Sequence, residues 1–170
     1  MLVVSNTSPI LNLALINRLS LVQEQFNTII IPKGVLEELR VEENLPGSKK
    51  ILDAMDAKWL QVEEVQDSVT LRILKRELDA GEAEAIALAL ENRSKWVLLD
   101  ESEARRIAKD IGLRVTGVLG ILLRACRQER IPSLRAEMEN LRERAGFYIS
   151  NQLFEDLLKQ SQNFKDLPKV

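Results

Sequence analysis

Short apolar runs alternate with longer segments of helical periodicity along the chain. Consecutive apolar residues flanked by turn residues predict strands that are covered on both faces. We expect five such strands, at residues 2–4, 28–31, 59–62, 96–99 and 113–115. Apolar residues spaced three or four apart predict helices at residues 10–16, 33–41, 49–57, 69–78, 82–90, 101–111, 118–127, 133–144 and 151–160.

The order of these elements indicates the fold class. Strands that alternate with helices predict an α/β fold with a mainly parallel sheet. No internal repeat, low-complexity tract or linker divides the chain, so we expect one domain over residues 1–160. Residues 161–170, SQNFKDLPKV, are expected to fray, as chain ends commonly do.

Two helix boundaries carry a specific expectation. Ser8 is expected to cap the first helix, with Pro9 in its first turn. Gly81 is expected to interrupt the chain between two helices, before the alanine-rich segment at residues 82–90.

Charge and composition exclude several classes of protein. The 24 basic and 26 acidic residues give a net charge of -2, which argues against a sequence-independent DNA coat but leaves room for a local basic patch. No apolar stretch is long enough to span a bilayer, and the N-terminus does not resemble a secretory signal. Because Cys126 is the single cysteine and has no internal disulfide partner, we expect a reducing, cytoplasmic location.

The chain contains no histidine. This absence excludes Ser-His-Asp and Cys-His catalysis, histidine-ligated zinc and imidazole as a general base. With one cysteine, a cysteine-based structural zinc site is excluded as well. Any catalysis must therefore use carboxylates, lysine or arginine, hydroxyl groups or a bound metal ion.

Polar residues follow two of the predicted strands. Asn6 comes after the first strand and Asp100 after the fourth, and ligands of open α/β sheets bind beyond the carboxyl ends of strands. Glu38 borders the apolar stripe of one helix, and Glu82 and Glu84 lie at the start of another. Carboxylates that converge in one crevice disfavour each other's charge, and a hard divalent cation such as Mg²⁺ or Mn²⁺ removes that conflict. Such an ion supports phosphodiester hydrolysis.

Each of these residues also has an ordinary interpretation. An acid in a first helical turn, such as Glu82, is commonly a solvated partner of the helix dipole. Glu38 fits a surface position, Asp100 fits the cap of the next helix, and residues 5–8 fit a simple turn. The joint placement of all of them at strand ends and helix starts favours a site.

Four stretches, in order, resemble the PIN-domain family: SNTSPILNLA, IIIPKGVLEEL, LDAGEAEAIALAL and VLLDESEARRIAKDIGLRVTGVLGILLRA. The later stretch LRERAGFYISNQLFEDLL is similar to the same family. The resemblance implies a three-layer α/β/α sandwich and a metal-dependent ribonuclease that uses Mg²⁺ or Mn²⁺. It also implies RNA as the substrate and, as for the toxin half of a toxin–antitoxin pair, an antitoxin protein as a partner.

Carried over by position, the four acidic sites of the family fall on Asn6, Glu38, Glu82 and Asp100, with Glu84 as the second choice for the third. The resemblance makes these four both the catalytic residues and the metal ligands. The family typically has aspartate at the first site, so Asn6 is a departure. Its amide offers an oxygen but no charge. This leaves open a catalytically weak or inactive module that binds RNA or protein.

Several residues are candidates to hold substrate. Thr7 and Ser8 are placed to orient a ligand or phosphate, and Lys33, Arg105, Arg106 and Arg114 are candidates for RNA phosphates. Arg105 and Arg106 also fit ordinary helix-surface charges. Aromatic residues make up only 4% of the chain, so base stacking is not expected to dominate binding.

Two further alternatives concern other functions of the chain. A small phosphatase or nucleotide-binding protein is disfavoured because there is no glycine-rich phosphate loop and no Asp-x-Asp pair. The apolar residues of the C-terminal helices fit either a homodimer contact or, more simply, packing on the core; they are Leu141, Phe147, Leu153, Phe154 and Leu157.

Overall fold

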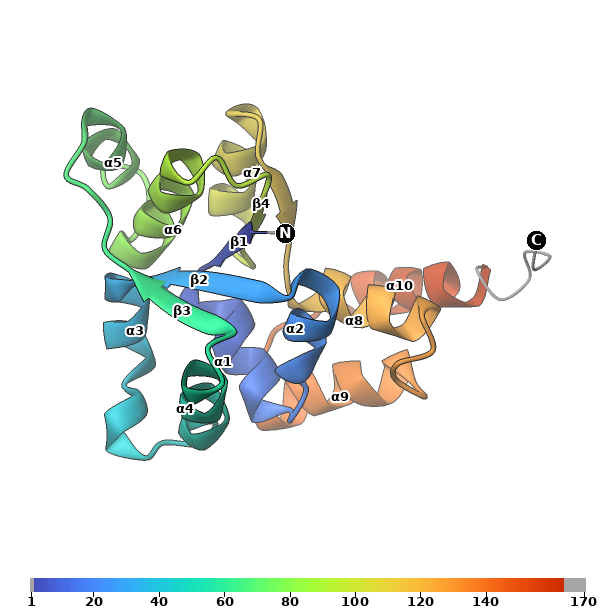
Figure 1. The fold of residues 1–170 in the computed structure, drawn as a ribbon. Helices are drawn as coiled ribbons and strands as arrows, with labels where there is room; N and C mark the ends of the chain where they lie inside the picture. Colours follow the sequence, from blue (N-terminus) through green and yellow to red (C-terminus); the bar gives the residue numbers. More distant parts are fainter. Residues whose placement is uncertain (1, 164–170) are drawn as a thin grey trace.

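A computed structural model describes residues 2–163 of the chain (Figure 1). Its centre is one parallel sheet of five strands in the order β3-β2-β1-β4-β5. The strands are β1 (Leu2–Ser5), β2 (Thr28–Pro32), β3 (Leu60–Glu63), β4 (Trp96–Leu98) and β5 (Arg114–Thr116). All five predicted strands are therefore present, within two residues of their predicted bounds, and the predicted parallel α/β fold is confirmed.

Both faces of the sheet are buried, which explains why the strands are unbroken apolar runs. Neighbouring residues of β1 point to opposite faces, so Val3 and Val4 belong to two different apolar clusters. Ile29 and Ile31 share the cluster of Val3, and Ile30 shares that of Val4. A helix layer on each face gives the three-layer sandwich.

The two helix layers differ in size. The face of Val4 is covered by α5 (Val69–Leu74), α6 (Ala80–Glu91) and α7 (Ser102–Asp110). The face of Val3 is covered by α1 (Thr7–Leu15), α2 (Ser20–Phe26), α3 (Lys33–Leu39), α4 (Ser48–Asp56) and α8 (Val118–Arg127). The last two helices, α9 (Leu134–Arg144) and α10 (Asn151–Asn163), pack on α8, and the short 3-10 helix η1 (Val41–Glu43) follows α3.

Several local expectations were wrong. Helix α1 begins at Thr7, so Asn6 occupies the N-cap position, and Ser8 bonds to a different element. Gly81 lies inside α6, which Asp79 caps through a reciprocal pair of hydrogen bonds with Glu82. Helix α2, of seven residues, was not predicted.

The C-terminal helix continues beyond its predicted end. Helix α10 includes residues 161–163 of the segment that was expected to fray. The expectation for residues 164–170 lies outside the described residues. Within the described chain, no helix has the length and apolar character that crossing a bilayer requires.

The strand order locates the crevice in which a ligand should bind. From β1 the chain adds β2 and β3 on one side, and then β4 and β5 on the other. The order therefore reverses between β1 and β4, and the carboxyl ends of such a pair form the usual ligand crevice of open α/β sheets. Asn6 and Asp100 follow these two strands.

Candidate functional site

Asn6 lies directly after β1, at the carboxyl edge of the sheet. Its backbone N–H donates a 3.0 Å hydrogen bond to the carbonyl of Leu98, which extends the pairing of β1 with β4. The residue is 6% exposed, and its amide oxygen Oδ1 is buried with no hydrogen-bond donor among the described residues. A buried acceptor without a donor destabilises the fold, so this oxygen is suited to a ligand that accepts its lone pairs.

Glu38 of α3 lies beside Asn6, and both side chains contact Gly81 of α6. A Cβ atom on Gly81 would lie 2.6 Å and 2.8 Å from the two carboxylate oxygens of Glu38 and 3.0 Å from Asn6 Oδ1. Glycine at position 81 therefore lets Glu38 and Asn6 approach the backbone of α6 closely, where a side chain would clash with both groups. The hydroxyl of Thr7 donates a hydrogen bond to Glu38 Oε2 and orients that carboxylate.

Glu82 is the third residue of α6 and is 6% exposed. Burial raises the pKa of its carboxyl above the ordinary value, and the nearby charges of Asp79, Glu101 and Glu38 raise it further. A 3.0 Å hydrogen bond from its own backbone N–H to Asp79 fixes the helix start at which it sits. Glu82 therefore lies within electrostatic reach of Glu38.

Glu84 faces different neighbours. Its carboxylate lies against Gly34 in the first turn of α3, and Lys75 Nζ lies 3.7 Å from its Oε1. Its side chain is 19% exposed. The two glutamates of α6 are thus directed to different parts of α3, Glu82 within reach of Glu38 and Glu84 toward Gly34.

Asp100 follows β4 and is held by two donors. The Ser8 hydroxyl donates a 2.7 Å hydrogen bond to Oδ2, and the backbone N–H of Val118 donates a 2.9 Å hydrogen bond to Oδ1. Asp100 therefore caps α8 rather than the helix that follows it in sequence. Burial raises the pKa of its carboxyl, while the hydrogen bonds from Ser8 and Val118 and the charge of Arg105 oppose that rise.

A relay of side chains supports Asp100 from α1. Asn12 donates a 2.9 Å hydrogen bond to the hydroxyl oxygen of Ser8. Ser8 accepts this bond through its oxygen and donates its own proton to Asp100. Asn12 is a buried polar residue on the largely apolar helix α1, four residues after Ser8. This i, i+4 spacing is the sequence signal by which the contact could have been predicted.

These oxygen atoms fit a hard divalent cation. Within residues 2–163, no three aspartate, glutamate or cysteine side chains gather closely enough to form a metal group by themselves. An ion here would therefore need the amide oxygen of Asn6 beside Glu38, together with water. Mg²⁺ accepts such a set because it prefers oxygen ligands and commonly retains several waters. The unpaired oxygen of Asn6 is the observation that favours the fit.

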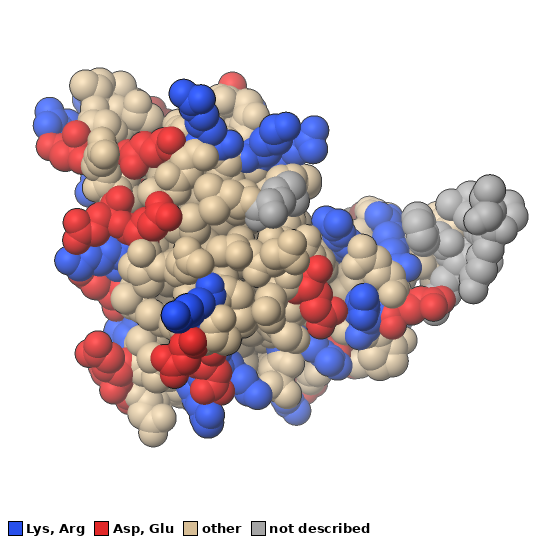
Figure 2. All heavy atoms as spheres, viewed as in Figure 1, with Lys and Arg blue, Asp and Glu red and all other residues tan. Residues whose placement is uncertain are grey.

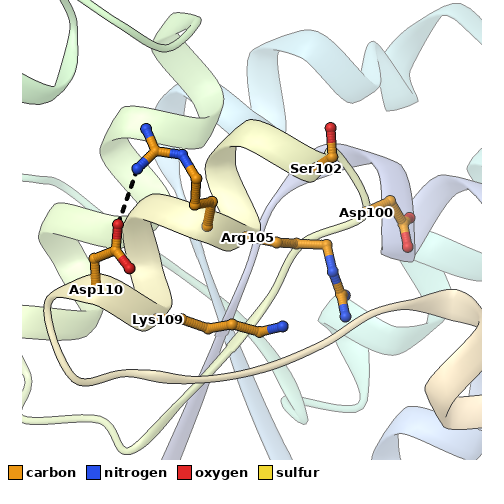
Figure 3. Close-up of a pocket in the computed structure, with 6 residues that line it drawn as sticks. Asp100, Ser102, Arg105, Lys109 and Asp110 are labelled. Carbon is orange, nitrogen blue, oxygen red and sulfur yellow. Dashed lines mark hydrogen bonds and ion pairs between the residues drawn. The ribbon is translucent and has the colours of Figure 1, made fainter.

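A cationic hollow adjoins the acidic residues. It has a volume of about 430 Å³ and is lined by Asp100, Ser102, Arg105, Arg106, Lys109 and Asp110. Figure 3 shows Arg105 and Lys109 extending from α7 along the same wall, with Asp100 at the edge. Arg105 donates a 2.8 Å hydrogen bond to the carbonyl of Leu99, and Lys109 forms no ion pair with any described residue.

The other candidate phosphate contacts are engaged elsewhere. Lys33 pairs with Glu64 at 3.3 Å on the surface, and Arg106 pairs with Glu103 and Asp110. Arg114 lies over the ring of Trp96, 5.9 Å from its centroid. Acidic and basic side chains are interspersed on the face that Figure 2 shows, in keeping with the small net charge. Any phosphate contact therefore depends on a few local cations.

Two charged residues beside Asp100 were not anticipated. Glu101 raises the pKa of both Glu82 and Asp100, after the larger effect of burial on each. Lys109 lies one helical turn beyond Arg105 on α7. The i, i+4 spacing of Arg105 and Lys109 is a sequence signal for a shared helix face, but only the packing of α7 shows that this face adjoins Asp100.

Comparison with known proteins identifies the family. A family model described as a PIN domain matches residues 2–163. No curated protein and no solved structure matches the chain. The family match agrees with the ordered motifs and with the three-layer fold, and it supports a nuclease-type module that binds nucleic acid. PIN domains generally depend on divalent metal ions. The chain therefore belongs to the PIN-domain family.

Proposed function

We propose that this protein is a ribonuclease that hydrolyses RNA phosphodiester bonds with Mg²⁺ or Mn²⁺ held by Asn6, Glu38, Glu82 and Asp100. The observation that carries the proposal is the buried, unpaired oxygen of Asn6 beside the carboxylate of Glu38, both of which approach α6 closely at Gly81. The family match supports a nuclease-type module over residues 2–163.

The chain's own residues have distinct roles in this proposal. Thr7 orients Glu38, and Ser8 with Val118 orients Asp100, so both carboxylates are held before substrate arrives. Arg105 and Lys109 line a hollow that Asp100 also lines. This position beside Asp100 suits them to contact the phosphates of RNA. When bound, the metal ion lowers the pKa of a water molecule and stabilises the charge of the departing oxygen.

The test is cleavage of structured and unstructured RNA by the purified full chain with Mg²⁺ or Mn²⁺, against a chelator and against Asp100→Ala. We expect metal-dependent cleavage that the substitution abolishes. Cleavage that Asp100→Ala leaves unchanged would count against the assigned site. As a control, Asp56→Ala removes a carboxylate at the end of α4 that takes no part in the site, and it should leave cleavage intact.

A second function is favoured by one observation, the uncharged side chain at position 6. An amide oxygen binds a divalent cation more weakly than a carboxylate does, and the described residues contain no three-acid metal group. The protein would then bind RNA or a protein partner with little or no turnover. RNA binding by the parent protein without cleavage, together with strong metal binding by Asn6→Asp, would favour this function.

The biological setting is also a proposal. As the toxin half of a toxin–antitoxin pair in the cytoplasm, the protein would arrest growth when produced alone. Production of a protein encoded by the neighbouring gene would relieve the arrest. Growth arrest that Asp100→Ala does not weaken would contradict a toxin role based on this site.

A further inference from the structure

A second hollow adjoins Asp100 beside the cationic one. Its volume is about 320 Å³, and Asp100 and Arg105 line both hollows. Its remaining wall is apolar, with Leu119 from α8, Phe147 from the segment between α9 and α10, and Leu153 and Leu157 from α10. Asp100 and Arg105 therefore lie at the boundary between a cationic surface and an apolar one.

The apolar wall is accessible. Leu153 is 40% exposed, and Phe147 and Leu119 are half-buried, whereas Leu157 is buried at the base. Gly117 and Gly120 line the same hollow and add no side chains to it. The exposed parts of these apolar side chains therefore offer a ligand a contact surface directly beside Asp100 and Arg105.

The pairing of these two surfaces matches the chemistry of single-stranded nucleic acid. Each nucleotide carries a charged phosphate and, on the other side of its sugar, a flat apolar base. Proteins that bind single strands combine a cationic groove for the phosphates with apolar or aromatic side chains for the bases. Arg105 and Lys109 supply the first surface, and Phe147 with its leucine neighbours supplies the second.

We propose that the apolar hollow is a subsite for one nucleobase of single-stranded RNA, the base next to the phosphate that Arg105 contacts beside the metal site, with Phe147 and Leu153 as its principal contacts. The inference rests on the proposed function, because that function brings a phosphate to the metal site beside Asp100. A base can enter such a hollow only when it is unstacked, so the subsite selects single-stranded or looped RNA over duplex.

The dimensions favour a base over a protein segment. The volume of about 320 Å³ is near the lower end of the range for small-ligand sites, about 300–1,000 Å³. A docked helix needs a groove that continues for several turns with apolar anchors along it. This hollow instead ends at the charged groups of Asp100 and Arg105, and beyond them the surface is cationic.

The experiment measures binding of a short single-stranded oligoribonucleotide with a cleavage-resistant phosphorothioate backbone to the full-length protein in Mg²⁺, so that the metal site can engage a phosphate while no bond is cleaved. An abasic nucleotide is placed at each position in turn. We expect one position at which the missing base weakens binding roughly tenfold, within the range measured for stacking of one base on a side chain. Phe147→Ala should weaken binding of the intact oligonucleotide to a similar extent and should remove the penalty at that position.

Matched variants separate the subsite from general damage. Leu153→Ala should give a smaller loss of affinity at the same position, and because Leu153 lies on the surface this variant tests the proposal even if Phe147→Ala does not fold. Ile73→Ala removes a side chain that is 57% exposed on α5, which does not line the hollow, and it should change nothing.

Several results would overturn the subsite. One is that the oligonucleotide does not bind at all. Another is that no abasic position weakens binding. A third is that the loss of affinity caused by an abasic nucleotide is the same in Phe147→Ala and Leu153→Ala as in the wild type. A self-associated protein that Leu153→Ala dissociates, with RNA affinity unaltered, would show instead that two copies meet at this hollow. Metal-dependent cleavage without base dependence would refute the subsite alone, and base-dependent binding without cleavage would refute the catalytic proposal alone.

Discussion

The hydroxyl of Ser8 donates a 2.7 Å hydrogen bond to Asp100, a residue 92 positions further along the chain. The bond joins the segments that follow β1 and β4, the two strands between which the strand order reverses. It also favours the ionised form of a carboxylate whose pKa burial raises. Ser8 therefore sets both the position and the charge of Asp100.

Replacement of Ser8 by alanine should raise the pKa of Asp100 further, because one of the groups that oppose the effect of burial is removed. We expect activity to fall about tenfold at neutral pH, the lower end of the range for groups that orient metal ligands, and to recover as pH rises. The lost hydrogen bond should lower the free energy of unfolding by about 1 kcal/mol. A pH–rate profile and chemical denaturation measure the two effects.

Ser68→Ala is the control for that experiment, because Ser68 caps α5 by accepting a 3.1 Å hydrogen bond from Leu71. It should cost a similar amount of stability, about 1 kcal/mol, without moving the pH–rate profile. A Ser8→Ala profile that coincides with the wild-type profile would show that the hydroxyl has only a structural role.

Replacement of Gly81 by alanine should lower metal affinity without lowering the stability of the fold. Alanine is favoured over glycine in a helix by about 1 kcal/mol, so Gly81→Ala should unfold at an equal or higher temperature. The new Cβ atom would lie 2.6 Å from Glu38 Oε1 and would displace that carboxylate from Asn6. We expect at least a tenfold loss of Mg²⁺ or Mn²⁺ affinity, measured by isothermal titration calorimetry.

Gly34→Ala is a matched control because Gly34 is also a helical glycine that lies against a carboxylate, that of Glu84. If Glu82 is the third acidic residue, Gly34→Ala leaves metal affinity unchanged while Gly81→Ala lowers it. A loss of metal affinity in Gly34→Ala would instead assign the third position to Glu84.

The sequence predicted the fold well because its signals are local. The run Ile29–Ile31 has no polar face, and the alternation of such runs with helices requires a parallel sheet covered on both sides. The sequence also located the polar residues that follow β1 and β4. The partners of those residues were less predictable because they depend on packing. Asp100 caps α8, and Gly81 is a place of close approach inside a helix, not a break.

Replacement of Asn6 by aspartate should convert the unpaired amide oxygen into a charged ligand. We expect metal affinity to rise at least tenfold, since each added carboxylate strengthens binding of a hard cation. In a chelator the variant should lose about 1–2 kcal/mol of stability, because a buried charge then faces Glu38 without a cation. Calorimetry and thermal unfolding with and without Mg²⁺ measure both changes.

Asn6→Ala completes the comparison. It removes a buried acceptor that has no donor, so stability in a chelator should be nearly unchanged. Metal affinity should fall. If Asn6→Ala binds the ion as tightly as the parent protein does, the amide oxygen is not a ligand.

The raised pKa of Glu82 makes the stability of the metal-free protein fall as pH rises. At a pH below the ordinary value of about 4.3, the carboxyl is protonated in both the folded and unfolded states and contributes no difference. Above it, the unfolded chain releases the proton first, which favours unfolding until the pH exceeds the folded-state pKa. Glu82→Gln, which keeps an acceptor for Asp79 N–H, should therefore be more stable than wild type at neutral pH in EDTA.

The difference between Glu82→Gln and wild type should vanish near pH 4, and Mg²⁺ should stabilise the wild type selectively. Glu91→Gln, at the exposed end of α6, is the control and should follow the wild-type pH dependence. A Glu82→Gln variant that is less stable than wild type at every pH would mean that the carboxylate contributes a favourable contact in the folded chain.

The cationic hollow should contribute to RNA affinity without regard to sequence. Lys109→Ala removes a charge that no described residue neutralises, so it should weaken binding evenly across sequences. It should also reduce the slope of log K against the logarithm of salt concentration by about one.

Arg106→Ala should weaken RNA binding less than Lys109→Ala, because Glu103 and Asp110 already neutralise that guanidinium. Lys33→Ala tests a candidate outside α7, whose charge is paired with Glu64. Equal effects of all three would indicate diffuse attraction to the surface and no defined phosphate path along α7.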